Sequence, residues 1–174
     1  WRATTFYTEE PETIAWLDSF NSNDVLWDIG ANVGLYSIYA ALNAKCRVIA
    51  IEPEAQNFAL LMENIALNNV QDKVQATNMA VTESFGIGDL NVHAITKGGA
   101  YNQFALKGTT EQTSDIGECS VSQLQLGACM DELISLFGFP TPSYIKLDVD
   151  GIEPEIVRGG KDLLGGGDCK SILI

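Results

Sequence analysis

The stretch "VLWDIGANVGLYSIYAALNAKCRVIAIEP", residues 25–53, decides the fold of this 174-residue chain. Two short apolar runs, VLWDI and RVIAIE, stand on either side of a segment whose apolar residues have helical spacing. Between the first run and that segment lies the turn 28–34, which reads D-I-G-A-N-V-G. An acid and two glycines directly after a buried strand indicate more than simple packing.

The same alternation of strand and helix continues along the chain. We expect strands at residues 25–29, 47–52, 73–81, 143–148 and 171–174, and helices at 12–20, 33–43, 55–69, 130–138 and 153–167. This order predicts parallel strands joined by right-handed crossovers. Because the strands are apolar throughout, both faces of the sheet should be covered. The predicted fold class is therefore α/β, doubly wound, with a mainly parallel sheet.

Residues 85–126 break this pattern and are rich in Gly, Thr, Ser, Gln and Asn. Two moderate strand patterns in this stretch predict an inserted β-hairpin or flap, although a polar surface excursion explains the composition equally well. We expect residues 1–174 to form a single domain. The chain ends inside an apolar run, so we also expect a fragment of a longer protein that lacks the C-terminal strands of the sheet.

Charge and composition exclude several classes of partner. The chain has ten Lys and Arg residues and 23 Asp and Glu residues, which gives a net charge of −13. This charge disfavours binding to nucleic acids and to anionic membranes. Neither a membrane-length apolar run nor a secretion signal is present, so we expect a cytoplasmic segment. The four cysteines (Cys46, Cys119, Cys129 and Cys169) are scattered and His93 has no ligand-spaced neighbour, so no metal site is predicted.

The turn 28–34 favours a ligand without phosphate. Gly30 lets the backbone turn sharply, and Gly34 lets the following helix pack closely. Its pattern is D-x-G-x-x-x-G and not the G-x-G-x-x-G of dinucleotide folds. Asp28 would oppose a pyrophosphate but suits an ammonium group, which favours S-adenosylmethionine over NAD. A purely structural turn with a capping Asp remains the alternative.

Two further strand ends fit a nucleoside. Glu52 ends the second strand, where an acid can accept hydrogen bonds from both ribose hydroxyls. The third strand ends at Asn78, Met79 and Ala80, which could border an adenine. The alternatives are a surface acid before a proline and a methionine in the core.

The stretch "YIKLDVDGIEPEIVRGG", residues 144–160, gathers Asp148, Asp150 and Glu153 beside Lys146. Like charges at such short spacing raise at least one pKa when partly buried, which makes a candidate general base. Stabilisation by a helix N-terminus explains Asp150 and Glu153 equally well. Hard oxygen ligands also suit magnesium, but no fixed ligand geometry is evident, and we predict no metal.

Together, "DIGANVGLYSIYAA", "VIAIEPEAQNFALLMENIALNN", "MDELI" and "YIKLDVDGIEPEIVRGG" resemble the FkbM-type methyltransferases, in family order over nearly the whole chain. The resemblance implies a Rossmann-like class I fold, S-adenosyl-L-methionine as cofactor, and O-methylation of a small-molecule or sugar hydroxyl. It implies that Asp148 lies near the transferred methyl group. For direct in-line transfer to an oxygen, we expect the catalytic residues to be Asp148 and Asp150, which could take the hydroxyl proton. Asp150 stands where the family more often has Glu. The implied cofactor contacts are Asp28, Gly30, Asn32 and Gly34 at the methionine end, Glu52 at the ribose, and Asn78, Met79 and Ala80 at the adenine.

Two other functions stay open from the sequence. One is an NAD-linked oxidoreductase, and the other is a non-catalytic Rossmann-like module that binds a partner. The sequence does not define the oligomeric state.

Overall fold

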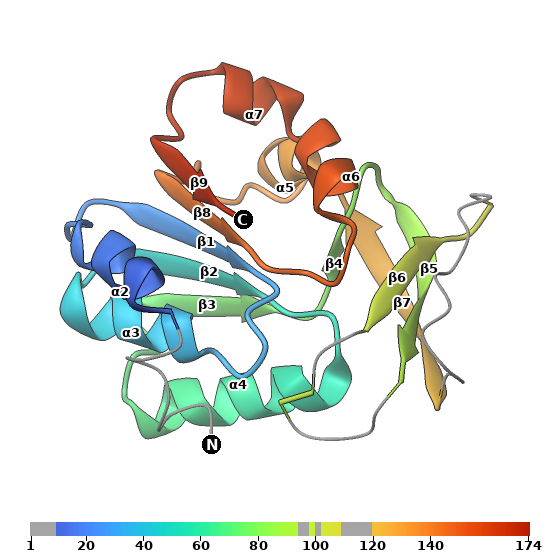
Figure 1. The fold of residues 1–174 in the computed structure, drawn as a ribbon, viewed down its shortest axis with the longest axis horizontal. Coiled ribbons are helices and arrows are strands. Elements are labelled where there is room, and N and C mark those ends of the chain that lie inside the picture. The colour runs from blue at the N-terminus through green and yellow to red at the C-terminus, as the bar shows by residue number, and fades with distance from the viewer. Residues whose placement is uncertain (1–9, 94–97, 100–101, 109–119) are drawn as a thin grey trace.

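The computed structural model describes residues 10–93, 98–99, 102–108 and 120–174. Its centre is a five-stranded sheet, sheet A, with strand order β3-β2-β1-β8-β9 and parallel pairing throughout (Figure 1). The strands are β1 (Val25–Ile29), β2 (Arg47–Ile51), β3 (Val74–Thr77), β8 (Tyr144–Leu147) and β9 (Ser171–Leu173). This arrangement confirms the predicted doubly wound α/β fold, which is Rossmann-like.

Both faces of sheet A are covered because its side chains alternate between two apolar clusters. Leu26 and Val48 pack toward one face, under α2 (Pro11–Asp18), α3 (Leu35–Asn43) and α4 (Ala55–Leu67). Trp27 and Ile49 pack toward the other, under α5 (Met130–Ser135), α6 (Glu153–Arg158) and α7 (Lys161–Gly165). Figure 1 shows the two helix layers on opposite sides of the sheet. Among the described residues, no helix is long and apolar enough to cross a membrane.

A second sheet, sheet B, lies beside sheet A and has the order β4-β7-β5-β6. Its strands are β4 (Ala80–Val81), β5 (Gly86–Val92), β6 (Gln103–Leu106) and β7 (Val121–Ala128). β5 is antiparallel to both β6 and β7, whereas β4 is parallel to β7. The predicted flap at 85–126 is therefore confirmed as β structure in its described residues, which form β5, β6 and β7 of one sheet and not a lone hairpin; residues 94–97, 100–101 and 109–119 of this stretch lie outside the described part of the chain.

Two predicted elements are wrong in their extent. The strand expected at 73–81 is divided into β3 and β4, which belong to different sheets. The break falls at Asn78, whose amide donates to the carbonyl oxygens of Glu52 and Pro53 and so holds the chain where it leaves sheet A. The helix expected at 153–167 is divided into α6 and α7 at Gly159 and Gly160. Both glycines pass close to α5: a Cβ at Gly159 would lie 2.7 Å from Cβ of Cys129, and one at Gly160 would lie 2.3 Å from Cε of Met130.

The strand order changes direction between β1 and β8. From β1 the chain proceeds outward through β2 and β3, while β8 and β9 occupy the other side. The carboxyl ends of β1 and β8 therefore lead into loops that diverge, and such a switch point is where open α/β sheets bind their ligands.

Candidate functional site

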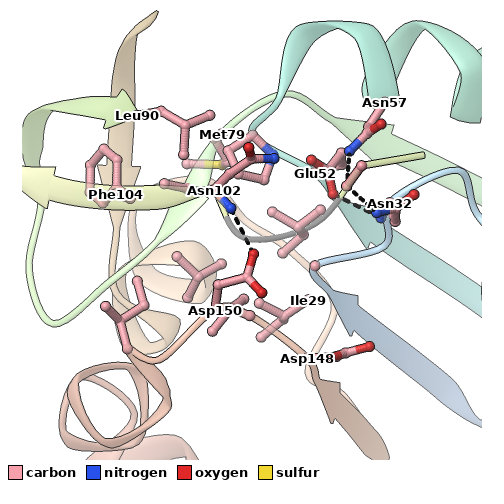
Figure 2. A pocket seen from close by; sticks show the side chains of 18 residues that line it. Ile29, Asn32, Glu52, Asn57, Met79, Leu90, Asn102, Phe104, Asp148 and Asp150 are labelled. Atoms are coloured by element: carbon pink, nitrogen blue, oxygen red, sulfur yellow. Dashed lines mark hydrogen bonds between the residues drawn. The ribbon is translucent and has the colours of Figure 1, made fainter. Parts of the chain in front are cut away.

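A cavity opens at this switch point, with an empty volume of about 790 Å³ counted out to its open mouth. One end is polar and is lined by Gly30 and Asn32 after β1, by Glu52 after β2 and by Asn57 of α4. The other end is apolar and is lined mainly from sheet B and from residues just after β3 and β8. Its lining includes Met79, Ala80, Val81, Leu90, Phe104 and Ile152 (Figure 2).

The turn after β1 depends on two glycines for different reasons. Gly30 has φ +80°, and a Cβ there would lie 2.0 Å from the carbonyl oxygen of Asp148. It therefore allows the ends of β1 and β8 to meet beneath the cavity. Gly34 has φ +85°, and a Cβ there would lie 2.3 Å from Cδ1 of Leu61 in α4. The structure thus gives Gly34 a packing role, and Gly34 does not line the cavity.

Asp28 is fully buried behind the turn and does not line the cavity either. Its Oδ2 accepts a hydrogen bond from Ser37 Oγ at 2.6 Å. No described residue hydrogen-bonds to Oδ1. Burial raises the pKa of Asp28, and the positive charge of Lys146 opposes that rise. A direct contact between Asp28 and a ligand in the cavity is not part of this geometry.

Lys146 links Asp28 to the rim of the cavity. It lies opposite Asp28 in the β1–β8 pairing and is 2% exposed. Its Nζ donates to Asp148 Oδ2 at 2.7 Å and lies 4.7 Å from the centre of the Tyr36 ring. Since the Asp148 side chain is 64% exposed, this ion pair runs from the interior of the fold to the surface of the site.

Glu52 is 5% exposed and accepts two backbone hydrogen bonds. Asn32 N donates to its Oε2 at 2.8 Å, and Glu54 N donates to its Oε1 at 2.9 Å. A carboxylate has about four acceptor positions, so each oxygen can accept one bond more. Burial raises the pKa of Glu52 to about 7, although these two N–H groups favour the charged form.

The residues predicted for the adenine divide into two groups. Met79 and Ala80 line the cavity and are buried there. Asn78 does not line it, because its side-chain amide is used to hold the chain against the carbonyl oxygens after β2.

Of the three acids predicted after β8, two line the cavity and one does not. Asp148 and Asp150 line the cavity, and Asp150 Oδ2 accepts a hydrogen bond from the backbone N of Asn102 at 2.8 Å. Glu153 begins α6 and does not line the cavity. Among the residues that the structure describes, no three His, Cys, Asp or Glu side chains are grouped so that they could hold a metal ion.

The sequence prediction missed a clamp around Gly98 and Gly99. Asn57 Oδ1 accepts from Gly98 N at 2.8 Å, and its Nδ2 donates to Gly99 O at 3.1 Å. Asn32 Nδ2 donates to the same carbonyl oxygen at 2.9 Å. A signal for Asn57 was present, because it is a polar residue four positions before Leu61 on the buried face of a predicted helix.

Phe104 was also missed, and no local pattern pointed to it. Its ring lies across a glycine of β5 and a glycine of β7: a Cβ at Gly88 would lie 2.5 Å from Phe104 Cζ, and one at Gly127 would lie 3.0 Å from it. These glycines make room for the ring at the apolar end of the cavity. Only the pairing of β5, β6 and β7 brings the three residues together.

The charged lining has one sign. Among the described residues that line the cavity, Glu52, Asp148 and Asp150 are acidic and none is basic. Carboxylates can accept hydrogen bonds from hydroxyl and ammonium groups, and they repel phosphates. The fold and this lining define a Rossmann-like α/β protein whose switch-point cavity suits hydroxyl or ammonium groups better than phosphates.

Comparison with known families identifies the group within that class. The methyltransferase FkbM domain matches residues 28–172, so this chain belongs to the FkbM methyltransferase family.

Three relatives illustrate the match. The hexuronic acid methyltransferase AglP of Haloferax volcanii is 26% identical over 161 residues, covering 91% of this chain and 59% of that protein. The methyltransferase sdnD of Sordaria araneosa is 25% identical over 158 residues, covering 79% of this chain and 61% of that protein. A tRNA(Phe) (4-demethylwyosine(37)-C(7)) aminocarboxypropyltransferase of Pyrococcus horikoshii is 40% identical over 57 residues, covering 33% of this chain and 20% of that protein. The chain thus spans about three fifths of the length of AglP and sdnD.

Proposed function

We propose that this chain binds S-adenosyl-L-methionine and transfers its methyl group to the oxygen of a small-molecule or sugar hydroxyl. The observation that carries the proposal is the cavity at the β1–β8 switch point, whose described charged lining consists of carboxylates alone. S-Adenosylmethionine has a positive sulfonium, an ammonium group and two ribose hydroxyls, and it has no phosphate. NAD has a pyrophosphate, which this lining would repel.

The described residues fit such a cofactor in separate parts. Glu52 has acceptor positions left for the ribose hydroxyls. Met79, Ala80 and Phe104 offer an apolar end for the adenine. The backbone of the turn around Gly30 and Asn32 borders the polar end, which suits the methionine moiety. Asp28 and Gly34 support this turn from behind, and Asn78 holds the chain beside it.

The bound cofactor would supply an electrophilic methyl group on a sulfonium. The cavity would hold the acceptor oxygen in line with that group, and such alignment provides most of the rate acceleration in direct transfer. Asp148 or Asp150 would take the proton of the acceptor hydroxyl, because both carboxylates line the cavity. Lys146 would orient Asp148 through their ion pair.

A neutral hydroxyl acceptor agrees with the charge of the chain. AglP, by its name, acts on a hexuronic acid, which supports a sugar as one class of acceptor to test. The relatives that are tRNA-modifying enzymes by name match about a third of this chain. The net charge of −13 opposes a nucleic acid, so we propose that tRNA is not the acceptor.

Calorimetry of the full chain tests the cofactor. We expect S-adenosylhomocysteine to bind and NADH not to bind, and Glu52→Gln should weaken the binding of S-adenosylhomocysteine. Glu63→Gln, an exposed acid on α4, is the matched control. Binding of NADH without binding of S-adenosylhomocysteine would establish the oxidoreductase alternative.

Transfer of an isotope-labelled methyl group tests the acceptor. The labelled donor should be offered with neutral sugars, hexuronic acids, small alcohols and tRNA in parallel. We expect label in a hydroxylated small molecule or sugar. Cofactor binding without transfer to any of them would favour the non-catalytic binding module, and label in tRNA would contradict the proposed acceptor class.

A further inference from the structure

We infer that a second, smaller cavity beside the first binds a non-reacting sugar ring of the methyl acceptor. This inference rests on the proposed function and names the substrate class more closely. The acceptor has at least two rings, of which one is methylated and its neighbour occupies the second cavity. This cavity has an empty volume of about 430 Å³, counted out to its open mouth. It is lined from the segment after β4, from β6 and from the start of α6.

The two cavities adjoin at Phe104 and Ile152, which line both of them (Figure 2 shows Phe104 in the first). Asp148 and Asp150 line the first cavity and do not line the second. A hydroxyl that loses its proton to either carboxylate must therefore lie in the first cavity. A group in the second cavity is then another part of the acceptor. Because Ile152 follows Asp150 by two residues, their Cα atoms are at most about 7 Å apart, so adjoining rings of one molecule can occupy both cavities.

An aromatic ring forms part of the apolar lining of the second cavity. Phe104 packs with Leu106 and Ile152 in one apolar cluster, and all three residues line the cavity. The ring is fixed in place because it lies against Gly88 and Gly127. A pyranose has an apolar face of C–H groups, and burial of that face against such a surface is favourable.

The polar lining can bind the hydroxyls of the same sugar ring. Thr82 and Ser84 contribute hydroxyl groups, and Glu83 and Glu155 contribute carboxylates. A hydroxyl both donates and accepts hydrogen bonds, whereas an ionised carboxylate only accepts them, so this set matches a ligand with several hydroxyls. Hydrogen bonds to an ionised group are about twice as strong as those between neutral groups.

Arg158 joins the two carboxylates of this lining. Its Nε lies 3.3 Å from Glu83 Oε1, and its Nη2 lies 2.7 Å from Glu155 Oε1. The hydrogen bond from Arg158 lowers the pKa of Glu155, which keeps this carboxylate ionised. A carboxylate has about four acceptor positions, so both can bind a ligand while they remain paired with Arg158. Recognition of a sugar therefore requires no unpaired charge.

The backbone that carries Thr82 and Glu83 is held by its neighbours. Thr82 N donates to Ala128 O at 3.0 Å, directly after the paired residues of β4 and β7. A Cβ at Gly159 would lie 2.8 Å from Thr82 O and 2.9 Å from Glu83 O. The end of α6 thus packs on this segment through a position that only glycine fits. The polar lining is therefore built into the fold.

Binding of glycosides to the full chain, saturated with S-adenosylhomocysteine, tests the inference. The probes are methyl glycosides of neutral pyranoses and of hexuronic acids, each as a single ring and as a two-ring glycoside. Saturation-transfer NMR identifies the glycosides that bind, and calorimetry measures their Kd. We expect at least one two-ring glycoside to bind about ten times more tightly than its single-ring counterpart, because the second ring adds hydrogen bonds to carboxylates.

Two variants change the second cavity at residues that do not line the first. Ser84→Leu places a larger, apolar side chain there, and Glu83→Gln removes a charged acceptor. Each should weaken binding of the two-ring glycoside about fivefold or more. Each should leave the Kd of the single ring and of S-adenosylhomocysteine unchanged. Glu63→Gln is the matched control, because Glu63 is an exposed acid that lines neither cavity, and it should change none of these constants.

The outcomes separate the inference from the proposed function. If S-adenosylhomocysteine binds but no glycoside does, or if no two-ring glycoside binds more tightly than its single ring, the inference is wrong while cofactor binding stands. An advantage of the second ring that neither variant reduces would also overturn it. Failure of S-adenosylhomocysteine to bind would overturn the proposed function, and the inference with it.

Discussion

Sheets A and B form two walls of one cavity and are built by different rules. Sheet A is wholly parallel and buried on both faces, so its strands are nearly continuous apolar runs. Sheet B contains both parallel and antiparallel pairs, and only one of its faces is buried. Leu90 and Phe104 lie on the buried face, while Ile87 and Leu124 are exposed. Sheet A supplies the charged end of the cavity and sheet B much of the apolar end.

This difference indicates which wall of the cavity is fixed by the fold and which wall can change in shape. The turn and the acids of sheet A lie on strands that are fixed by packing on both sides. Sheet B has one free face, so its strands can change without disturbing the main core. We propose that the two sheets form one domain, because neither encloses the cavity alone.

The strongest test of the sheet A wall is Gly30→Ala. The new Cβ would lie 2.0 Å from the carbonyl oxygen of Asp148 at a φ of +80°. We expect a loss of at least about 4 kcal/mol in the free energy of unfolding, measured by urea denaturation. Gly151→Ala is the control for the backbone conformation alone, because its φ is +99° and no atom lies within 4 Å of its Cβ. It should cost only about 1–2 kcal/mol, and an equal loss in both variants would contradict the close approach of β1 and β8.

Exchange of Lys146 in sheet A and of Lys107 beside sheet B compares a buried lysine with an exposed one. Lys146→Met leaves the buried Asp28 without its neighbouring positive charge and should cost about 3 kcal/mol of unfolding free energy. Lys107→Met removes the partner of Asp89 in sheet B, where both side chains are largely exposed, and should cost less than about 1 kcal/mol. Urea denaturation measures both variants. Equal losses would show that Lys146 contributes no more than a surface charge.

The two sheets also differ in how far the sequence predicts them. Unbroken apolar strands and helical spacing predict sheet A and its helices, because burial on two faces leaves a strong local pattern. Sheet B was foreseen only as a hairpin or flap, since the parallel pairing of Ala80 and Val81 with β7 joins residues far apart in sequence. The break at Asn78 depends on its hydrogen bonds to Glu52 and Pro53, which no periodicity reveals.

The candidate site follows the same division. The motif at strand ends predicts Gly30, Asn32 and Glu52, which meet in the cavity. The motif also predicts Asp28 and Gly34, but both residues lie behind the cavity and do not line it. A motif gives the positions of residues along the chain and does not show which of them face the cavity. Asn57 and Phe104 depend on contacts between distant segments and were missed. The roles in binding that the sequence predicts for Gly30, Asn32 and Glu52 stay predictions.

Glu52→Gln should change the pH dependence of stability. The pKa of Glu52 is raised to about 7 in the folded protein, mainly by burial, from an ordinary value of 4.5. The folded state therefore binds more protons than the unfolded state between these values, and the wild-type protein loses stability as the pH rises through them. Relative to wild type, we expect Glu52→Gln to gain about 1–3 kcal/mol between about pH 5 and pH 8. Urea denaturation at several pH values measures this difference, and a constant difference would contradict the raised pKa.

The smallest expected effect concerns the sheet B wall. Phe104→Leu removes an aromatic ring from the apolar end of the cavity and keeps an apolar side chain there. If that end holds the adenine, the affinity for S-adenosylhomocysteine should fall about three- to tenfold, as measured by calorimetry. Phe85→Leu is the matched control, since Phe85 is 51% exposed and does not line the cavity. Loss of affinity in both variants would indicate a general loosening of sheet B. Loss in Phe104→Leu alone would indicate that sheet B contributes a binding surface as specific as that of sheet A.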